Sequence, residues 1–202
     1  MRTAGSSGAA TERAIREAGL ALIAEHGYEG MSLRQLAAKV GIQPGSLYNH
    51  IATKQQLLFD LVSGHMNELL DSCDAALAGI RDPAEALAAF CAFHLRHHMT
   101  RKAEVFVINF ELRSLEPDNR AKVVRLRSAY EDRLVRILEA GQASGAFRRT
   151  DPRVTAFAVI GMLTHVCTWR REGGRLSEDD IVALYEGLVF GGVGAGQSLS
   201  AK

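Results

Sequence analysis

A short segment near the N-terminus carries side chains that could hydrogen-bond to nucleic acid. Ser46, Tyr48, Asn49 and His50 supply hydroxyl, amide and imidazole groups, and Leu47 is the one strongly apolar residue among them. Groups of these kinds contact the base edges and phosphate oxygens of duplex DNA. Since only Leu47 needs burial, the polar residues are expected to face solvent. We therefore interpret this segment as a candidate DNA-binding surface.

Two short helices joined by a tight turn would present this surface. Ser32 and Gln35 form a capping box that begins a helix, and Gly41 is a typical residue at a helix C-terminus. Pro44 fits the first turn of a second helix, where its missing N–H removes a donor that would lack a partner. The pattern predicts a helix-turn-helix, whose second helix enters the major groove of DNA.

A further helix is expected to begin at Thr53 and to continue to about Leu77. Thr53 and Gln56 repeat the capping-box spacing. Lys54 lies in the first turn, where the helix dipole favours acidic over basic side chains. A bound phosphate would explain a cation at this position.

The chain from Thr11 to Leu58 resembles the DNA-binding domain of the tetracycline-repressor-like (TetR) family of bacterial regulators. The residues that carry the resemblance are Ile15, Ala18 and Leu22 of the leading helix, His26-Gly27-Tyr28, Gly41-Ile42, Ser46-Leu47-Tyr48, His50 and Thr53-Lys54. The chain departs from the family pattern at Ile51, where Phe is usual, and at Gln43, where Ser or Thr is frequent.

This resemblance implies which residues contact DNA. The implied set is Ser32, Arg34, Gln43, Pro44, Gly45, Ser46, Tyr48, Asn49, His50 and Lys54. Within it, Tyr48, His50 and Lys54 would hold phosphates, whereas Arg34, Pro44, Gly45, Ser46 and Asn49 would lie near bases. A helical hairpin unrelated to DNA is the alternative, because a helix-turn-helix pattern also occurs in other helical proteins.

The balance of charge is weak for a protein that binds DNA as a single copy. The chain has 202 residues and a formal net charge of +1, and residues 1–54 hold six basic and four acidic side chains. Because affinity for DNA grows with the number of phosphates neutralised, two copies on one palindromic operator are expected. A protein that coats DNA without sequence preference would need far more positive charge.

The expected fold class is all-α. Helix starts are indicated by Asp82-Pro83, Glu116-Pro117, Asp151-Pro152 and the acidic run Ser177-Glu178-Asp179-Asp180. We expect an N-terminal three-helix helix-turn-helix domain over residues 11–53 and a larger helical ligand-binding and dimerisation domain over residues 54–190. Residues 1–10 and 191–202, rich in Gly, Ser and Ala, are expected to be disordered ends.

The cysteine content and the hydropathy pattern favour the cytoplasm. Cys73, Cys91 and Cys167 are odd in number and far apart, so they predict no disulfide framework. The N-terminal segment lacks the apolar core of a secretory signal, and no apolar run is long enough to cross a bilayer. No membrane partner is therefore expected.

Two C-terminal helices carry apolar stripes that could form a subunit interface. The candidate interface residues are Phe157, Ala158, Gly161, His165, Ile181, Leu184 and Leu188. The family resemblance favours a homodimer in which the last two helices of each copy build a four-helix bundle. The alternative is that both stripes pack on the core of their own domain.

The region from Asp82 to Ser144 mixes apolar and polar side chains, as small-molecule pockets do. The candidate ligand-binding residues, extended to the later Trp-Arg pair, are His94, Phe106, Asn109, Phe110, Arg113, Tyr130, Trp169 and Arg170. A stripe of Phe and Leu at helical spacing is, however, more often plain core than a ligand site.

Two motifs bear on the ligand. Glu111–Leu115 and Trp169–Ser177 resemble segments of TetR-type regulators of fatty-acid and steroid catabolism, many of which respond to acyl-CoA thioesters. The chain departs at Arg170, where those relatives usually carry Tyr, and at Glu172, where they carry Pro. The resemblance implies a small hydrophobic effector, either an acyl-CoA or another lipid or drug. The side chains of Arg113, Arg170, Arg171 and Arg175 could hold the phosphates of coenzyme A, or could simply lie at solvated helix ends.

Metal and enzyme functions are the weaker interpretations. His94, His97 and His98 lie close in sequence, but no carboxylate or cysteine nearby completes a set of ligands, so no metal and no cofactor are expected. No nucleophile elbow, Gly-rich phosphate loop or HExxH motif is present, so no catalytic residue is assigned. The sequence thus predicts a dimeric, ligand-responsive transcriptional repressor, with activation of some promoters left open and an all-α enzyme as the remaining alternative.

Overall fold

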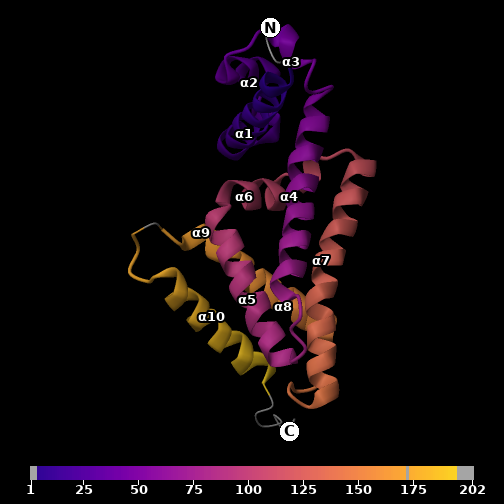
Figure 1. Ribbon diagram of the computed structural model, residues 1–202, viewed down its shortest axis with the longest axis vertical. Helices are drawn as coiled ribbons and strands as arrows, with labels where there is room; N and C mark the ends of the chain where they lie inside the picture. The colour runs from indigo at the N-terminus through magenta and orange to yellow at the C-terminus, as the bar shows by residue number, and fades with distance from the viewer. Residues whose placement is uncertain (1–3, 172, 195–202) are drawn as a thin grey trace. The chain divides into compact units, whose positions relative to one another are not determined.

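The computed structural model describes residues 4–171 and 173–194, with the side chains from residue 8 onward. Over these ranges the chain is helical and contains no β-strand, apart from an isolated bridge between Phe147 and Gly194. The helices are α1 (Ala4–Gly30), α2 (Leu33–Val40), α3 (Pro44–Leu47), α4 (Lys54–Leu77), α5 (Pro83–Thr100), α6 (Lys102–Phe110), the 3-10 turn η1 (Leu112–Ser114), α7 (Pro117–Ser144), α8 (Pro152–Thr164), α9 (Val166–Trp169) and α10 (Glu178–Val193) (Figure 1). The prediction of an all-α fold is confirmed.

The chain forms two compact units. The first contains the residues up to Met66 together with Ala103–Arg125, and the second contains Asn67–Lys102 and the residues from Leu126 onward. Helices α4 and α7 each contribute residues to both units. This division differs from the domain boundary expected at residue 53, because α4 runs on as one helix and because residues in the 103–125 segment bond to α1 and α4.

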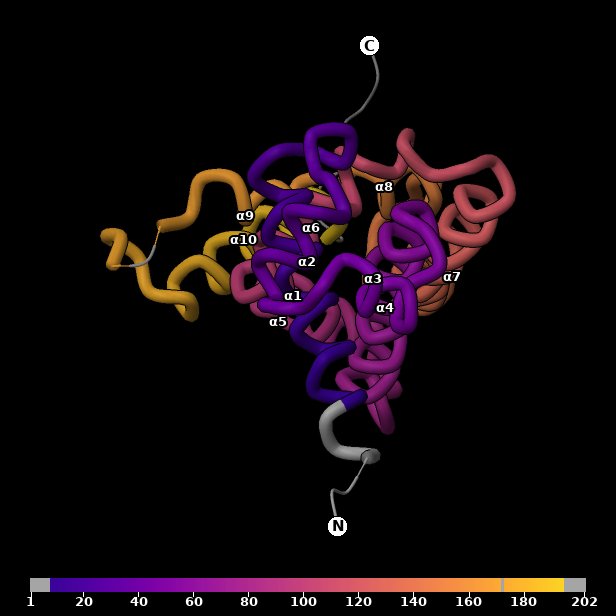
Figure 2. The backbone as a smooth tube through the Cα atoms, turned by 90° about the horizontal axis from the view of Figure 1, so that it is seen from above, coloured from indigo at the N-terminus to yellow at the C-terminus, as the bar shows by residue number. Residues whose placement is uncertain are grey.

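Helices α1, α2 and α3 gather around a small apolar core in the first unit (Figure 2). The largest fully buried side chains of this core are Ile15, Ile23, Met31, Leu36, Leu47, Leu57 and Leu58. Helix α1 is interrupted at Gly27, whose φ of 73° lies in the left-handed region that favours glycine. Residues 4–10, expected to be disordered, form the first turns of α1, and their alanines are strong helix formers.

The local geometry of the helix-turn-helix follows the sequence pattern. Ser32 Oγ accepts the backbone N–H of Gln35 at 3.2 Å, and Gln35 Oε1 accepts the N–H of Ser32 at 2.8 Å. Gly41 ends α2 in the left-handed conformation. The second helix, α3, is short, and the Gln43 side chain does not cap it. The expected capping box therefore begins α2, whereas α3 depends on other contacts.

The second capping box, expected at the start of α4, is only half formed. Thr53 Oγ1 accepts the N–H of Gln56 at 3.0 Å. The Gln56 side chain, however, donates to Asp60 Oδ1 at 2.7 Å, one turn further along the helix. A carboxylate four residues ahead competes for the amide that would otherwise return to Thr53.

In the second unit, α5 contacts α8, α9 and α10, and the views in Figures 1 and 2 both place α10 alongside it. The helix starts predicted from acid-proline pairs are confirmed, because Asp82 and Asp151 each accept two backbone N–H groups at 2.9 Å. A capping box between Ser177 and Asp180 begins α10. Residues 191–193, expected to belong to a disordered tail, are helical, and the rest of that tail from residue 195 lies outside the described residues.

The core of the second unit contains a cluster of buried histidines. His94 lies between the hydroxyls of Tyr130 and Thr164, at 2.8 Å from Nδ1 and 3.0 Å from Nε2. The His98 ring stacks on the His94 ring with centroids 3.8 Å apart, and its Nδ1 donates to the His94 carbonyl. Burial lowers the pKa of His97 and of His98 to about 4, and that of His94 well below its usual range. The folded protein therefore holds these rings neutral.

Mild acid is expected to destabilise the second unit. In the unfolded chain a histidine binds a proton below pH 6.5, whereas in the folded chain His97 and His98 do so only near pH 4. The free energy of unfolding should be fully retained above pH 6.5 and should fall as the pH drops toward 4, by at most about 1.4 kcal/mol per pH unit for each fully buried histidine. Urea unfolding at pH values between about 7.5 and 5 measures this slope.

A His98→Asn variant should show a shallower slope, because one proton-binding site is lost. A His26→Asn variant is the matched control, since His26 is partly exposed and pairs only loosely with Glu25. A free energy of unfolding that does not change over this pH range would contradict the burial of neutral histidines.

Candidate nucleic-acid interface

The side chains predicted to contact DNA lie together on α2, on the α2–α3 turn, on α3 and at the start of α4. Ser32, Arg34, Gln43, Pro44, Gly45, Ser46 and Asn49 are exposed, and His50 and Lys54 are half-buried. Tyr48 is 59% exposed. All ten belong to the first unit, so a single compact body carries the whole candidate surface.

Leu47 fixes the short recognition helix to the rest of the first unit. Its side chain is fully buried, and its carbonyl accepts the N–H groups of His50 at 2.9 Å and Ile51 at 3.1 Å. The two residues that follow, Tyr48 and Asn49, are exposed, because burial of Leu47 turns this side of the chain toward the core and leaves theirs toward solvent. The arrangement presents a hydroxyl, an amide and an aromatic ring on one exposed turn.

Lys54 lies at the N-terminus of α4, where the first backbone N–H groups of a helix have no acceptor in the preceding turn of the same helix. Its ammonium lies 4.2 Å from the centre of the Tyr28 ring and donates to the Glu29 carbonyl at 3.4 Å. These contacts leave further ammonium protons for an anion. The cation and the helix N-terminus together can bind one phosphate.

Two residues of this surface escaped the sequence analysis. Tyr28 was named only among the residues that carry the family resemblance, yet the Lys54 ammonium lies over its ring. Glu12 lies on α1, with its carboxylate 3.9 Å from His50 Nδ1. The spacing of Glu12 and His50 in sequence gave no signal of this contact, which depends on how the segment after α3 lies against α1. An acid beside a predicted phosphate contact weakens the attraction of that site for DNA.

The eight candidate ligand-binding residues fall into separate groups. His94 and Tyr130 are hydrogen-bonded to each other in the second unit, with Thr164 as a third partner that the sequence analysis missed. Burial raises the pKa of Tyr130 well above its usual range, so its hydroxyl remains protonated. His94 thus joins two hydroxyls in a polar cluster, of which His94 and Tyr130 are buried and Thr164 is half-buried.

The other candidates lie elsewhere. The rings of Phe106 and Phe110 contact each other at a tilted angle along α6 in the first unit, where Asn109 and Arg113 are also exposed. The Trp169 ring stacks on the Tyr185 ring, and its indole N–H donates to the Tyr185 hydroxyl at 3.2 Å.

The four arginines considered for the phosphates of coenzyme A differ in their surroundings. Arg170 pairs with Glu178 at 2.8 Å. Arg113, Arg171 and Arg175 are exposed.

The outer faces of α8 and α10 are apolar and exposed. Phe157 is 50% exposed, Leu184 is 55% and Leu188 is 62% exposed, and Ala158, Gly161 and His165 are exposed on the same side of α8. Ile181, predicted to belong to this surface, does not: it is 1% exposed. It lies on the inward arc of α10 with Val182 and Val189, because α10 buries one side against its own unit.

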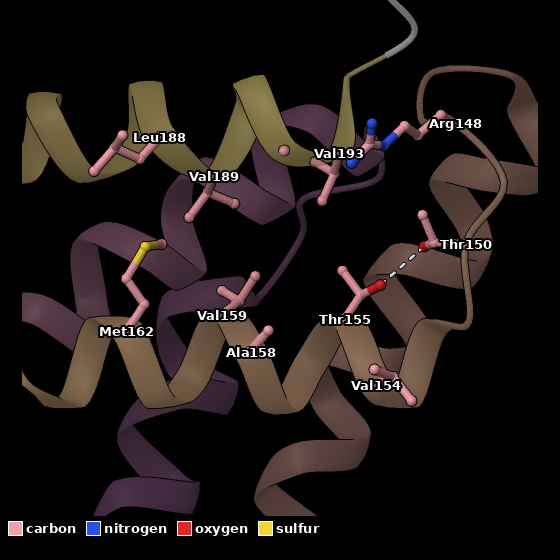
Figure 3. Close-up of a pocket in the computed structure, with 11 residues that line it drawn as sticks. Arg148, Thr150, Val154, Thr155, Ala158, Val159, Met162, Leu188, Val189 and Val193 are labelled. Carbon is pink, nitrogen blue, oxygen red and sulfur yellow. Dashed lines mark hydrogen bonds between the residues drawn. The ribbon is translucent and has the colours of Figure 1, made fainter. Parts of the chain in front are cut away.

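A groove of about 340 Å³ runs between α8 and α10 (Figure 3). Its apolar walls consist of Val154, Ala158, Val159, Met162, Leu188, Val189, Gly192 and Val193. Arg148, Thr150 and Thr155 lie at its polar end, where the two threonine hydroxyls are 2.9 Å apart. Two walls of the groove, Val154 and Leu188, are also among the most exposed apolar residues of the chain.

In the part of the chain that the structure describes, no group of three or more His, Cys, Asp or Glu side chains is placed to hold a metal ion, and both ring nitrogens of His94 lie within hydrogen-bond distance of hydroxyls. Among the described helices, none is long and apolar enough to span a membrane.

Two protein-family models match the chain. Residues 81–193 match the model described as "Tetracyclin repressor-like, C-terminal domain", and residues 15–61 match the one described as "Bacterial regulatory proteins, tetR family". Together these ranges cover the helix-turn-helix and most of the helical remainder.

Similar proteins cover nearly the full length. The chain is 25% identical over 193 residues to the HTH-type transcriptional repressor KstR2 of Rhodococcus jostii (strain RHA1). The aligned region covers 95% of this chain and 94% of that protein. A bacterial regulatory protein in the tetR family from Rhodococcus RHA1 superposes with a TM-score of 0.86 at 27% identity, over 93% of this chain and 98% of that one. AibR in complex with isovaleryl coenzyme A and operator DNA superposes with a TM-score of 0.79 at 30% identity, over 89% and 98% of the two chains.

Proposed function

Because the chain belongs to the TetR family of bacterial transcriptional regulators, we propose that it binds a palindromic operator as a homodimer and releases it when a small hydrophobic effector of the acyl-CoA class binds. The protein is a regulator and not an enzyme. The observation that carries the proposal is the exposed turn after buried Leu47, beside the Lys54 cation at the start of α4.

The first step is recognition of DNA by the turn that contains α3. A helix-turn-helix places the N-terminal part of its second helix against base edges, so Ser46 and Asn49 are positioned to hydrogen-bond to bases. Tyr48 and Lys54 flank this turn and would hold phosphates. A dimer would place two such turns in successive major grooves, roughly 34 Å apart.

Tyr48→Ala is expected to weaken operator binding by about tenfold, because an exposed phosphate contact is lost, and to leave the thermal midpoint of unfolding unchanged. The operator is first selected from a random duplex pool, and fluorescence anisotropy then measures affinity. Tyr48→Phe is the matched control that removes only the hydroxyl. Failure of the wild-type protein to enrich any sequence would refute the DNA-binding proposal, and a loss of dimer in Tyr48→Ala would show that Tyr48 is structural instead.

The second step is pairing of two copies through α8 and α10. Both helices expose large apolar side chains on adjacent faces. Monomeric proteins usually expose only small contiguous apolar patches. In a two-fold interface the same patch meets itself, so the groove between α8 and α10 of one copy would receive an apolar side chain of the other. Phe157 is exposed, aromatic and close to the groove wall at Ala158, which makes it the best candidate for that side chain.

Leu188→Glu should convert the dimer to monomers, because it places a carboxylate on each side of the proposed interface. Analytical ultracentrifugation measures the mass, and operator affinity should fall with it, since one copy neutralises too few phosphates. Val124→Glu is the matched control, as Val124 is an exposed valine on α7. A Leu188→Glu protein that remains dimeric would place the subunit interface elsewhere.

The third step is the response to an effector. The similarity to AibR, whose complex contains isovaleryl coenzyme A, supports an acyl-CoA as ligand. We assign the polar anchor to His94, Tyr130 and Thr164, because His94 hydrogen-bonds to the other two, His94 and Tyr130 are buried, and Thr164 is half-buried. An acyl thioester carbonyl could replace the hydrogen bond between His94 and Tyr130. Binding to one of two dimer states more tightly than to the other would lower operator affinity.

Acyl-CoA esters of increasing chain length, beginning with isovaleryl-CoA, should release the operator, whereas free coenzyme A should not. Tyr130→Phe should bind operator normally but need a higher ester concentration for release, because the hydroxyl contact is missing. If no acyl-CoA releases the operator, the proposed regulator role stands but acyl-CoA esters are refuted as its effector. Another lipid or a drug would then be the remaining class of effector.

A further inference from the structure

Glu111 is the only buried carboxylate among the side chains that the structure describes, at 8% exposed. A buried acid is costly unless its oxygens accept hydrogen bonds. Glu111 Oε1 accepts the backbone N–H of Tyr28 at 3.0 Å, and Oε2 accepts the Ser114 hydroxyl at 2.7 Å. The first of these bonds joins the end of α6 to α1 across 83 positions of sequence.

The break in α1 explains why a carboxylate is needed there. Gly27 has φ 73° and ψ 164°, so the helical hydrogen-bond ladder is interrupted and the Tyr28 N–H that follows requires another acceptor. A Cβ atom at Gly27 would lie 3.4 Å from Glu111 Oε1, in van der Waals contact with the carboxylate. The Glu111 carboxylate therefore lies against Gly27 and accepts the N–H group that the break in α1 leaves without a helical acceptor.

Gln55, in the first turn of α4, makes a second connection to Tyr28. Its Nε2 donates to the Tyr28 hydroxyl at 2.9 Å and to the Ser114 carbonyl at 2.7 Å. Its Oε1 accepts the N–H of Glu116 at 3.1 Å. Gln55 thus binds the segment 111–116 on one side and Tyr28 on the other.

The Tyr28 side chain is held at both ends and carries a cation on its face. Glu111 fixes its backbone, Gln55 fixes its hydroxyl, and the Lys54 ammonium lies 4.2 Å from the ring centre. A cation over an aromatic ring is attracted by the ring quadrupole. The position of the ammonium therefore follows the position of the ring.

We propose that Glu111 and Gln55 are positioning residues for operator binding: they fix Tyr28, whose ring holds the Lys54 ammonium where a DNA phosphate meets the start of α4. The inference rests on the DNA-binding role proposed above. It makes the segment 111–116, which contains the candidate ligand-binding residue Arg113, part of the DNA-binding apparatus.

The experiment measures operator affinity across a range of salt concentrations for Glu111→Ala, Lys54→Ala and the double variant. Each single variant should bind about tenfold more weakly. In each, the fall of log affinity with log salt should become less steep by about one, as expected for the loss of one phosphate contact. The double variant should bind no more weakly than Lys54→Ala, because both changes remove the same contact.

The sign of the effect separates positioning from simple charge. Removal of an acid from a DNA-binding protein should strengthen binding through electrostatics alone. Glu139→Ala, an exposed acid on α7, is the matched control and should bind operator at least as well as wild type. Glu111→Gln should recover most of the affinity, because its amide oxygen can accept the Tyr28 N–H and its NH₂ can donate to Ser114.

Two outcomes would overturn the proposal. One is a Glu111→Ala protein with wild-type salt slope, and the other is a double variant whose loss is the sum of the two single losses. If Glu111→Ala does not fold, Gln55→Ala decides, since it leaves both hydrogen bonds of Glu111 in place and should still reduce the steepness of the salt dependence. A wild-type protein that binds no duplex would instead refute the proposed function itself.

Discussion

The burial of Leu47 is the contact on which the recognition surface depends. A helix of four residues has no stability of its own, because nucleation fixes several dihedral angles for a single hydrogen bond. Burying one leucine side chain contributes roughly 1.5–3 kcal/mol, enough to hold such a turn against α2. Because the Leu47 side chain is fixed in the core, the side chains of Tyr48 and Asn49 are directed toward solvent. One apolar contact in the first unit thus decides which polar groups can meet a base pair.

Local features of the chain could be predicted from sequence because their causes are local. Ser32 with Gln35, Asp82 and Asp151 each cap a helix through atoms two or three residues away. The exceptions also have local causes. Gln56 turned to Asp60, an acceptor that the capping-box pattern ignores. Residues 4–10 were expected to be disordered from their Gly and Ser content, although their alanines favour the helix that is present.

Contacts between distant segments could not be predicted in this way. Periodicity placed Ile181 on an apolar stripe, but it does not say on which side of α10 the rest of the unit lies. The candidate ligand residues were chosen by type, and among those on different helices only His94 and Tyr130 are in contact, because that contact depends on how α5 lies against α7. Glu111 was noted as part of a motif, yet nothing in its neighbourhood indicates that its partner is Tyr28.

The fit between Gly27 and Glu111 constrains how this protein can change through evolution. Position 27 must be a residue that tolerates a left-handed backbone, and position 111 must supply an acceptor for the amide that the break in α1 leaves behind. A mutation at either site alone leaves a buried donor or a buried charge without its counterpart. We therefore expect the two positions to covary in descendants of this chain: lineages that restore a continuous α1 would lose the acid, and lineages that keep the acid would keep the glycine.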